Sequence, residues 1–280
     1  MSAINTITAD KLLRLIGTPK CPALIDVRTD EEFAADARLV PSSVRRLAAR
    51  VAEWACEFAG QSAVVLCQTG AAASPGVAAW LRNADVPAEM LEGGVQAWNA
   101  AKLAMVPQSR LPRRDDKGRT IWVTRVRPKV DRIACPWLIR RFVDPQAVFL
   151  YVAPTEVRGV AEQFGGAPFD IEGDGVFWSH RGERCTFDVM VEALGLTSFE
   201  ALQRLAVIVR GADTGQPELV PEAAGLLAAS LGLSRMYADD LEQLEAGMLL
   251  YDSFYRWCRD ATGETHNWTS HNPASPKVKR

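Results

Sequence analysis

The sequence predicts an α/β fold in two parts: a doubly wound parallel-sheet domain, followed by a mainly helical α+β domain. The length of 280 residues corresponds to two domains of ordinary size. In the first part, short apolar runs alternate with stretches of helical spacing, which predicts a parallel sheet with helices on both faces. From Ser198 onward the apolar spacing is mainly helical.

Three short apolar runs supply the expected strands of the first part. Residues 23–27, 63–67 and 88–91 are rich in apolar side chains, and the second run is β-branched and uncharged. Residues 44–58 and 76–83 have helical spacing. In parallel sheets, sites form beyond the carboxyl ends of the strands. The residues that follow each strand are therefore the first candidates for a site.

The second part should combine a few strands with several helices. Pro136 would fall near the first turn of a helix, where proline is tolerated, and Thr155 would cap the next helix. The expected strands are 120–126, 147–152 and 176–179, and the expected helices are 131–142, 155–164, 199–210, 218–231 and 239–258.

Composition and charge divide the chain into four segments. Residues 105–119 hold five basic and two acidic side chains, and Pro107, Pro112 and Gly118 interrupt any hydrophobic period there. This segment is expected to be a solvated hinge, and the polar end of the chain a loose tail. The predicted division is a first domain over 1–108, a basic linker over 109–119, a second domain over 120–260 and a flexible tail over 261–280.

Several classes of protein are excluded by the same numbers. A net charge of −2 and a pI near 6.0 make a nucleic-acid partner unexpected. No run reaches the roughly 18 apolar residues that a membrane span requires. The start has no signal-peptide pattern, and the six cysteines have no C-x-x-C spacing. We therefore expect a cytoplasmic protein with reduced thiols, without a membrane partner, a metal or a cofactor.

Cys67 is the strongest candidate for a reactive group. It closes the strand 63–67 and opens a loop of small residues, whose backbone N–H groups can turn inward and stabilise a thiolate. Ser74 would cap the following helix, with Pro75 at the first helical position. The alternative is a buried cysteine in a tight turn. The loop that would stabilise the sulfur consists of Gln68, Thr69, Gly70, Ala71, Ala72, Ala73 and Ser74.

Four ordered motifs of the first part resemble the rhodanese-like family: LIDVRTDEEF (24–33), ADARLVPSSV (35–44), the Cys67 loop and LEGGVQAW (91–98). Members of this family transfer sulfane sulfur through a persulfide on the loop cysteine. The resemblance implies that Cys67 carries the persulfide, and that the loop amides stabilise it. It also implies that Asp26 and Arg28 brace the fold. The expected partners are a small-molecule or protein sulfur donor and a thiol acceptor.

One departure from the family pattern concerns the sulfur donor. Many active loops of the family carry a basic residue shortly after the cysteine, but here no basic residue lies between Cys67 and Arg82. An anionic donor such as thiosulfate loses a charge-assisted contact worth roughly 1.5–3 kcal/mol. Weak thiosulfate turnover, or a persulfide delivered by another protein, is therefore expected. A regulatory or purely structural domain is the alternative.

The second part contains a set of cations suited to oxyanions. Thirteen of the 14 basic residues in 120–260 are arginines, which bind oxyanions in a bidentate manner, and His180 is the one histidine of that segment. The simpler interpretation is that these arginines pair with surface carboxylates. A metal held by His180, Cys185 and Asp188 is the least supported interpretation. The predicted oxyanion site comprises Arg132, Cys135, His180, Arg181, Cys185, Arg210 and Asp213.

The second part resembles the C-terminal domain of the ChrB-type chromate-resistance family. The motifs are DRIACPWLIRRFVDP (131–145), FDIEG with SHRGERCTFD (169–173 and 179–188), IVRGADT (208–214) and AAGLLAASLGLSR (223–235). The resemblance implies a role in chromate detoxification or sensing. It carries no catalytic residue over to this domain. Regulators of this family usually have a DNA-binding first half, where this chain resembles a rhodanese.

Together the two resemblances predict a rhodanese-like sulfurtransferase that carries sulfane sulfur on Cys67 and is associated with chromate resistance. The alternative is a chromate- or oxyanion-sensing, regulatory protein, in which the rhodanese-like part is weakly active or inactive.

Overall fold

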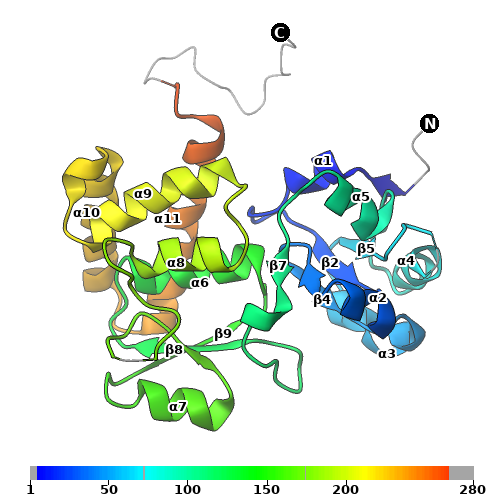
Figure 1. Ribbon diagram of the computed structural model, residues 1–280, viewed down its shortest axis with the longest axis horizontal. Coiled ribbons are helices and arrows are strands. Elements are labelled where there is room, and N and C mark those ends of the chain that lie inside the picture. The colour runs from blue at the N-terminus through cyan, green and yellow to red at the C-terminus, as the bar shows by residue number, and fades with distance from the viewer. Residues whose placement is uncertain (1–4, 72, 174, 265–280) are drawn as a thin grey trace.

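The computed structural model describes residues 5–71, 73–173 and 175–264 (Figure 1). Its first domain is built on a five-stranded parallel sheet with the strand order β1-β6-β5-β2-β4. The three predicted strands are present, and two short edge strands join them. The bounds are β1 Thr6–Ile7, β2 Ala23–Asp26, β4 Ser43–Arg45, β5 Ala63–Leu66 and β6 Ala88–Leu91.

Helices surround this sheet, as the doubly wound class predicts. Thr29 and Glu32 form a capping box at the start of α2, in which each side chain accepts from the other residue's backbone N–H. A small antiparallel pair, β3 Arg38–Leu39 with β7 Val106–Pro107, closes the domain. The helices are α1 Ala9–Leu13, α2 Asp30–Ala35, α3 Val51–Trp54, α4 Ser74–Asn83 and α5 Gly94–Ala100.

The expected continuous helix over 44–58 is wrong. The segment begins as strand β4, whose residues pair with β2 in parallel, and continues as 3₁₀ turns on either side of the single-turn helix α3. Pairing with a strand distant in sequence overrides the local helical spacing, because the ladder satisfies the backbone of Ser43–Arg45.

The basic segment after β7 has partners in its neighbourhood. It contains a 3₁₀ turn at Gln108–Arg110. The guanidinium of Arg114 lies 3.1 Å from the carboxylate of Asp144, and Arg119 lies 2.8 Å from Asp115. Part of the basic charge of the predicted hinge is therefore neutralised within the protein.

The second domain consists of a small parallel sheet and six helices in the described part of the chain. Figure 1 shows α7 on one face of this sheet and the remaining helices on the other. The strand order is β10-β8-β9. The bounds are β8 Ile121–Arg125, β9 Val148–Val152, β10 Ala167–Pro168, α6 Asp131–Phe142, α7 Val157–Phe164, α8 Thr186–Ala193, α9 Glu200–Asp213, α10 Glu222–Met236 and α11 Asp240–Asp260.

Three local predictions for this domain are wrong. Residues 176–179 form no strand but only an isolated bridge between Trp178 and Phe169. Thr155 does not cap α7, which begins after Glu156 without a side-chain cap. Pro136 lies inside α6 rather than in its first turn. The helix tolerates it because the carbonyl of Arg132, four residues earlier, accepts a hydrogen bond of 3.1 Å from the Tyr151 hydroxyl.

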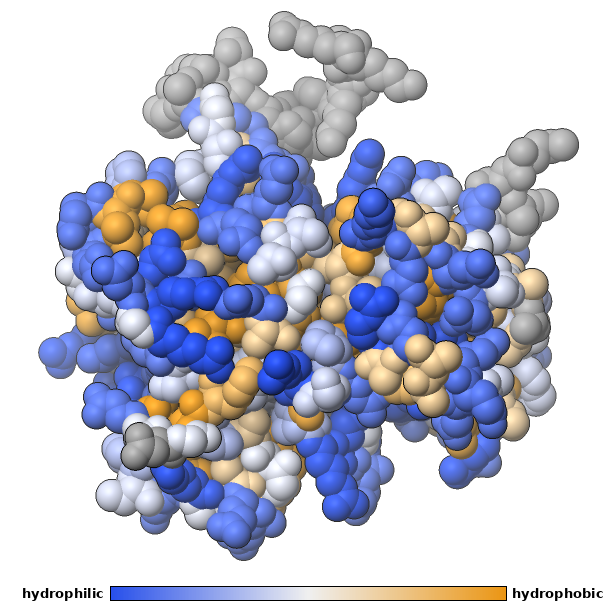
Figure 2. Space-filling view, in the orientation of Figure 1, coloured by the Kyte–Doolittle hydropathy of each residue, from blue (hydrophilic) through white to orange (hydrophobic). Residues whose placement is uncertain are grey.

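The two domains share one apolar core. The largest cluster of buried side chains includes Leu12 and Trp98 of the first domain and Trp137 and Phe142 of the second. The Ser42 N–H also donates to the Phe142 carbonyl at 2.7 Å. The visible face of the molecule is largely hydrophilic (Figure 2). None of the described helices is long and apolar enough to cross a membrane.

Candidate functional site

Cys67 follows β5 directly, at the carboxyl end of the first sheet. The loop after it is held by α5: the N–H groups of Val95 and Gln96 donate to the carbonyls of Cys67 and Gln68, each at 2.9 Å. Gly94 allows this approach, because its backbone has a φ of +61° and a Cβ there would lie 2.3 Å from the Cys67 carbonyl oxygen. The carbonyls of Cys67 and Gln68 therefore face α5.

The N–H groups of the described residues of this loop donate to no acceptor in the rest of the described chain. No hydrogen bond joins the amides of Gln68, Thr69, Gly70, Ala71 or Ala73 to another described residue. Two buried polar atoms of the loop, Gln68 Oε1 and Ser74 Oγ, are also without a hydrogen-bond partner among the described residues. The predicted loop residue Ala72 lies outside the described residues. A loop whose described amides have no acceptor is suited to an anionic group.

The predicted capping role of Ser74 is wrong. Ala73 occupies the N-cap, and Ser74 is the first residue of α4, followed by Pro75. The physical reason is that Ala73 already has helical dihedral angles, with φ −78° and ψ −28°, so the helix starts one residue earlier than expected.

Cys67 is buried in the apolar core of the first domain. The residue is only 2% exposed and packs in a cluster with Val65, Val77 and Ala78. Asp26 and Arg28 form a fully buried ion pair of 2.6 Å, and Arg28 also donates to the carbonyls of Asp36 and Arg38. This pair has the bracing role that the resemblance implied.

A second group of chemically active side chains lies at the carboxyl ends of β8 and β10. Asp131 is the first residue of α6, Asp170 follows β10, and Asp213 ends α9. The imidazole of His180 joins them: its Nε2 atom lies 3.1 Å from Asp213, 3.4 Å from Asp170 and 3.7 Å from Asp131. We call these four residues the aspartate–histidine cluster.

Two arginines approach the same cluster. The guanidinium groups of Arg132 and Arg125 lie 3.3 and 3.5 Å from Asp170 Oδ2. Thr186 Oγ1 donates to Asp170 Oδ1 at 2.9 Å, and the Phe187 N–H donates to Asp131 Oδ2 at 3.2 Å. The first two residues of α8 therefore hold the carboxylates of Asp170 and Asp131 in place.

Burial and mutual repulsion set the charges of the cluster. Burial, with the nearby charges of Asp213 and Asp170, raises the pKa of Asp131 well above its ordinary value. Hydrogen bonds to Asp170 and Asp213 raise the pKa of His180 to about 10. Burial works to raise the pKa of Asp170, but the hydrogen bond to His180 and the charge of Arg132 together lower it.

The structure brings together only part of the predicted oxyanion site. Arg132, His180 and Asp213 meet, but Arg181 lies over the ring of Phe177, 4.6 Å from its centroid. Arg210 pairs with Asp188 at 3.3 Å. The remaining two members, Cys135 and Cys185, are fully buried, and burial raises the pKa of both thiols.

Sequence reasoning left Asp131, Asp170 and Arg125 out of the predicted oxyanion site. The position of Arg125 at the end of a predicted strand and of Asp131 at the start of a predicted helix was an available signal. Asp170 lies in the FDIEG motif (169–173), but nothing local in that motif places it beside His180, because the two residues meet only through the packing of the domain. One oxygen or nitrogen atom each of Asp131, Asp170 and His180 lies within 4.8 Å of the others, which is the spacing of a metal site.

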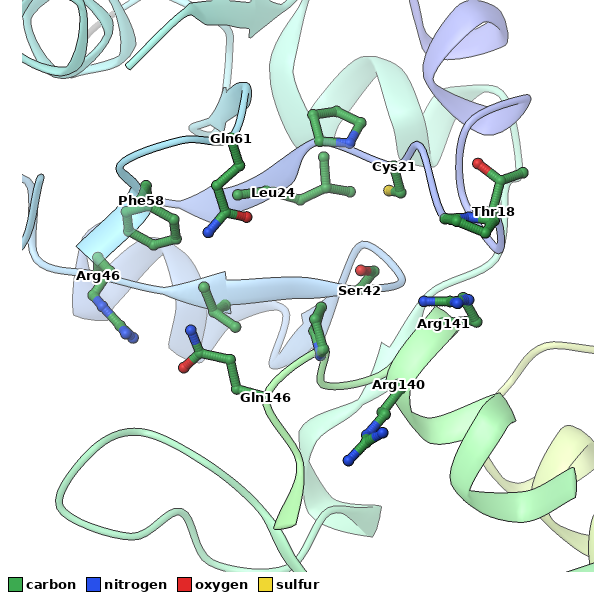
Figure 3. Close-up of a pocket in the computed structure, with 15 residues that line it drawn as sticks. Thr18, Cys21, Leu24, Ser42, Arg46, Phe58, Gln61, Arg140, Arg141 and Gln146 are labelled. Carbon is green, nitrogen blue, oxygen red and sulfur yellow. The ribbon is translucent and has the colours of Figure 1, made fainter. Parts of the chain in front are cut away.

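A cleft of about 330 Å³ lies between the domains (Figure 3). Its position at the amino end of β2 is at the opposite edge of the sheet from Cys67. Arg46, Arg140 and Arg141 line it, and each has a carboxylate partner. None of the sequence-predicted site residues is among its lining residues. The cleft therefore does not connect the Cys67 loop with the aspartate–histidine cluster.

Comparisons with known proteins also divide the chain into two domains. A relative, Protein ChrB of Cupriavidus metallidurans, is 39% identical over 149 residues, which are 52% of this chain and 43% of the relative. The chain thus spans less than half the length of that relative.

Two solved structures resemble the first domain. A rhodanese-related protein from Thermoplasma volcanium is 21% identical with a TM-score of 0.32, and covers 37% of this chain and 98% of its own. Thiosulfate sulfurtransferase from Pseudomonas aeruginosa is 25% identical with a TM-score of 0.31, and the match covers 38% of this chain and 20% of the sulfurtransferase chain.

Two family models also match, one described as rhodanese-like domain and one as ChrB, C-terminal domain. The chain therefore joins a rhodanese-like domain, over residues 8–101, to a ChrB C-terminal domain, over residues 122–258.

Proposed function

We propose that this protein is a sulfurtransferase that carries sulfane sulfur as a persulfide on Cys67. The observation that carries the proposal is the loop after β5, in which the carbonyls of Cys67 and Gln68 accept from α5 while the amides of residues 68–71 and 73 have no acceptor among the described residues. Such amides stabilise the thiolate before transfer and the persulfide anion after it.

The reaction needs no group beyond the loop, a donor and an acceptor. The Cys67 thiolate attacks the outer sulfur of a persulfide donor, the donor's sulfur–sulfur bond breaks, and the donor leaves as a thiolate. An acceptor thiolate then attacks the outer sulfur of the Cys67 persulfide and releases Cys67 as a thiolate. Because residues 68–81 contain no basic side chain, a persulfide donor fits this loop better than the dianion thiosulfate.

Intact mass spectrometry tests the proposal directly. Incubation with glutathione persulfide should add one sulfur, about 32 Da, to the protein, and thiosulfate should add less at equal concentration. Cys67→Ser should abolish the adduct. Cys56→Ser is the matched control, because Cys56 is the exposed cysteine of the same domain, and it should retain the adduct. An adduct that survives in Cys67→Ser, or no adduct with either donor, would sink the proposal.

We further propose that this activity serves chromate resistance in the cytoplasm. The ChrB C-terminal domain supports the first part, and six free cysteines support a reducing compartment. The same two variants extend the test: in a chromate-sensitive host, Cys56→Ser should restore growth on chromate and Cys67→Ser should not. Equal growth of the two would separate chromate resistance from sulfur transfer and favour the sensing alternative.

A further inference from the structure

We infer that Asp131, Asp170 and His180 form a binding site for a divalent transition-metal ion. The three residues come from three separate segments: the start of α6, the residue pair after β10 and the loop before α8. One potential ligand atom from each lies within 4.8 Å of the other two. Asp213 lies beside them, 3.1 Å from His180 Nε2.

An unpaired oxygen provides an independent indication of a missing cation. Asp131 is fully buried, and its Oδ2 atom accepts from the Phe187 N–H. Its Oδ1 atom has no hydrogen-bond partner in the described chain. A buried polar atom without a partner destabilises a protein, and charged groups do so most. A cation between Asp131 and its neighbours would satisfy this oxygen.

The surrounding residues hold the ligands in the manner of an outer coordination shell. Thr186 Oγ1 bonds Asp170 Oδ1, and the Phe187 N–H bonds Asp131 Oδ2, so neither carboxylate rotates freely. Val130 and Asp170 have positive φ angles of 36° and 50°. The packing of the domain holds these unusual backbone angles at Asp170 and immediately before Asp131.

The groups placed directly around His180 are carboxylates, which favour a cation over an oxyanion at that position. Three carboxylates surround His180, and the guanidinium groups of Arg125 and Arg132 are both directed at Asp170. A bound oxyanion would therefore face carboxylates on several sides.

The donor atoms indicate which cation. Two carboxylates and one imidazole suit Mn²⁺, Fe²⁺ or Zn²⁺, and the thiols of Cys135 and Cys185 do not belong to the group, which disfavours soft ions such as Cu(I). The side chain of His180 is 41% exposed, so an ion can reach the three residues from solvent.

Metal titration of the full chain tests the site without reference to activity. Protein stripped with EDTA is titrated with Mn²⁺, followed by electron paramagnetic resonance, and with Zn²⁺, followed by calorimetry. Wild type should bind one ion, and Asp170→Asn and His180→Gln should lose it. Thr186→Val should weaken binding roughly 10–100-fold, as expected for an outer-shell partner.

Asp188→Asn is the matched control. Asp188 is 7% exposed and lies 3.3 Å from Arg210, whereas Asp170 is 8% exposed and lies 3.3 Å from Arg132. Asp188 stands outside the group of three, so Asp188→Asn should bind the ion as wild type does. Because that variant removes a buried carboxylate of the same kind, it separates a ligand effect from damage to the fold.

A thermal measurement covers the case in which a variant binds nothing because it is unfolded. Asp131→Asn replaces a buried acid that lies against two other carboxylates with a neutral amide, so the metal-free variant should melt at or above the wild-type temperature, while the increase caused by Mn²⁺ or Zn²⁺ should vanish. Two results would overturn the inference. One is a wild type that binds neither ion, with the His180 imidazolium as the cation of the cluster. The other is binding that persists in both Asp170→Asn and His180→Gln.

Discussion

Single residues determine how closely the Cys67 loop can approach α5. Gly70 and Gly94 face each other across this contact: a Cβ on Gly70 would lie 2.9 Å from the Gly94 nitrogen, and a Cβ on Gly94 would lie 2.5 Å from the Gly70 nitrogen. Both have positive φ, at 78° and 61°. The backbones therefore touch directly, and the loop carbonyls reach the first amides of α5.

Gly94→Ala should separate the two backbones. The new methyl group would lie 2.3 Å from the Cys67 carbonyl, so the loop must move and its amides lose their common orientation. We expect a loss of stability of about 1–3 kcal/mol and a much smaller persulfide adduct. Urea unfolding and intact mass measure the two effects.

Gly76→Ala is the control for this substitution. Gly76 lies in α4, beside the same loop, and a Cβ added to it would meet no atom within 4 Å. It should gain up to about 0.5–1 kcal/mol from helix propensity and keep its adduct. Equal adducts in both glycine variants would show that the loop geometry is unimportant for sulfur transfer.

At the scale of elements, the sequence predicts those helices and strands that the local spacing of apolar residues determines. The bounds of α6 agree with the predicted helix 131–142, and β2, β5 and β6 lie within the predicted apolar runs. The predictions of secondary structure fail where pairing with a segment distant in sequence determines the structure. Ser43–Arg45 is a strand because β2 lies beside it, although its own spacing is helical.

The same distinction separates the two candidate sites. Cys67 and its loop are contiguous in sequence, so the strand, the small residues and the following helix could be recognised together. The aspartate–histidine cluster draws on four separate segments, and Asp170 and His180 meet only in the folded domain. Among the seven predicted oxyanion residues, only Arg132, His180 and Asp213 come together, because charge type predicts composition but not proximity.

The helix α6 depends on a hydrogen bond from outside itself. Pro136 has no N–H to offer the Arg132 carbonyl, and the Tyr151 hydroxyl of β9 donates to it instead. Tyr151→Phe should therefore cost about 0.5–1.5 kcal/mol in urea unfolding. In a Pro136→Ala background, the new N–H can serve the same carbonyl, so the cost of Tyr151→Phe should shrink. An equal cost in both backgrounds would contradict this account of the proline.

At the scale of the whole molecule, Phe142 connects the two domains. Its ring contacts Trp137, Phe199 and Tyr255 within the second domain, and it also lies against Gly17 of the first domain, where a Cβ would be 2.3 Å from the ring. One cluster of buried apolar side chains runs through both domains. The rhodanese-like domain and the ChrB C-terminal domain should therefore unfold together, in a single calorimetric transition.

Phe142→Ala should uncouple the domains as well as destabilise them. The truncation removes a large buried ring and should cost about 3–5 kcal/mol. Phe187→Ala is the matched control, because Phe187 is equally buried and stacks on the same Trp137, 6.4 Å between ring centroids, yet belongs to the second domain alone. Both variants should lose stability, but only Phe142→Ala should speed amide hydrogen exchange around Leu12–Gly17 beyond the global change and split the transition in two. If Phe187→Ala has the same effect on that segment, the coupling passes through the shared core as a whole and not through the contact between Phe142 and Gly17.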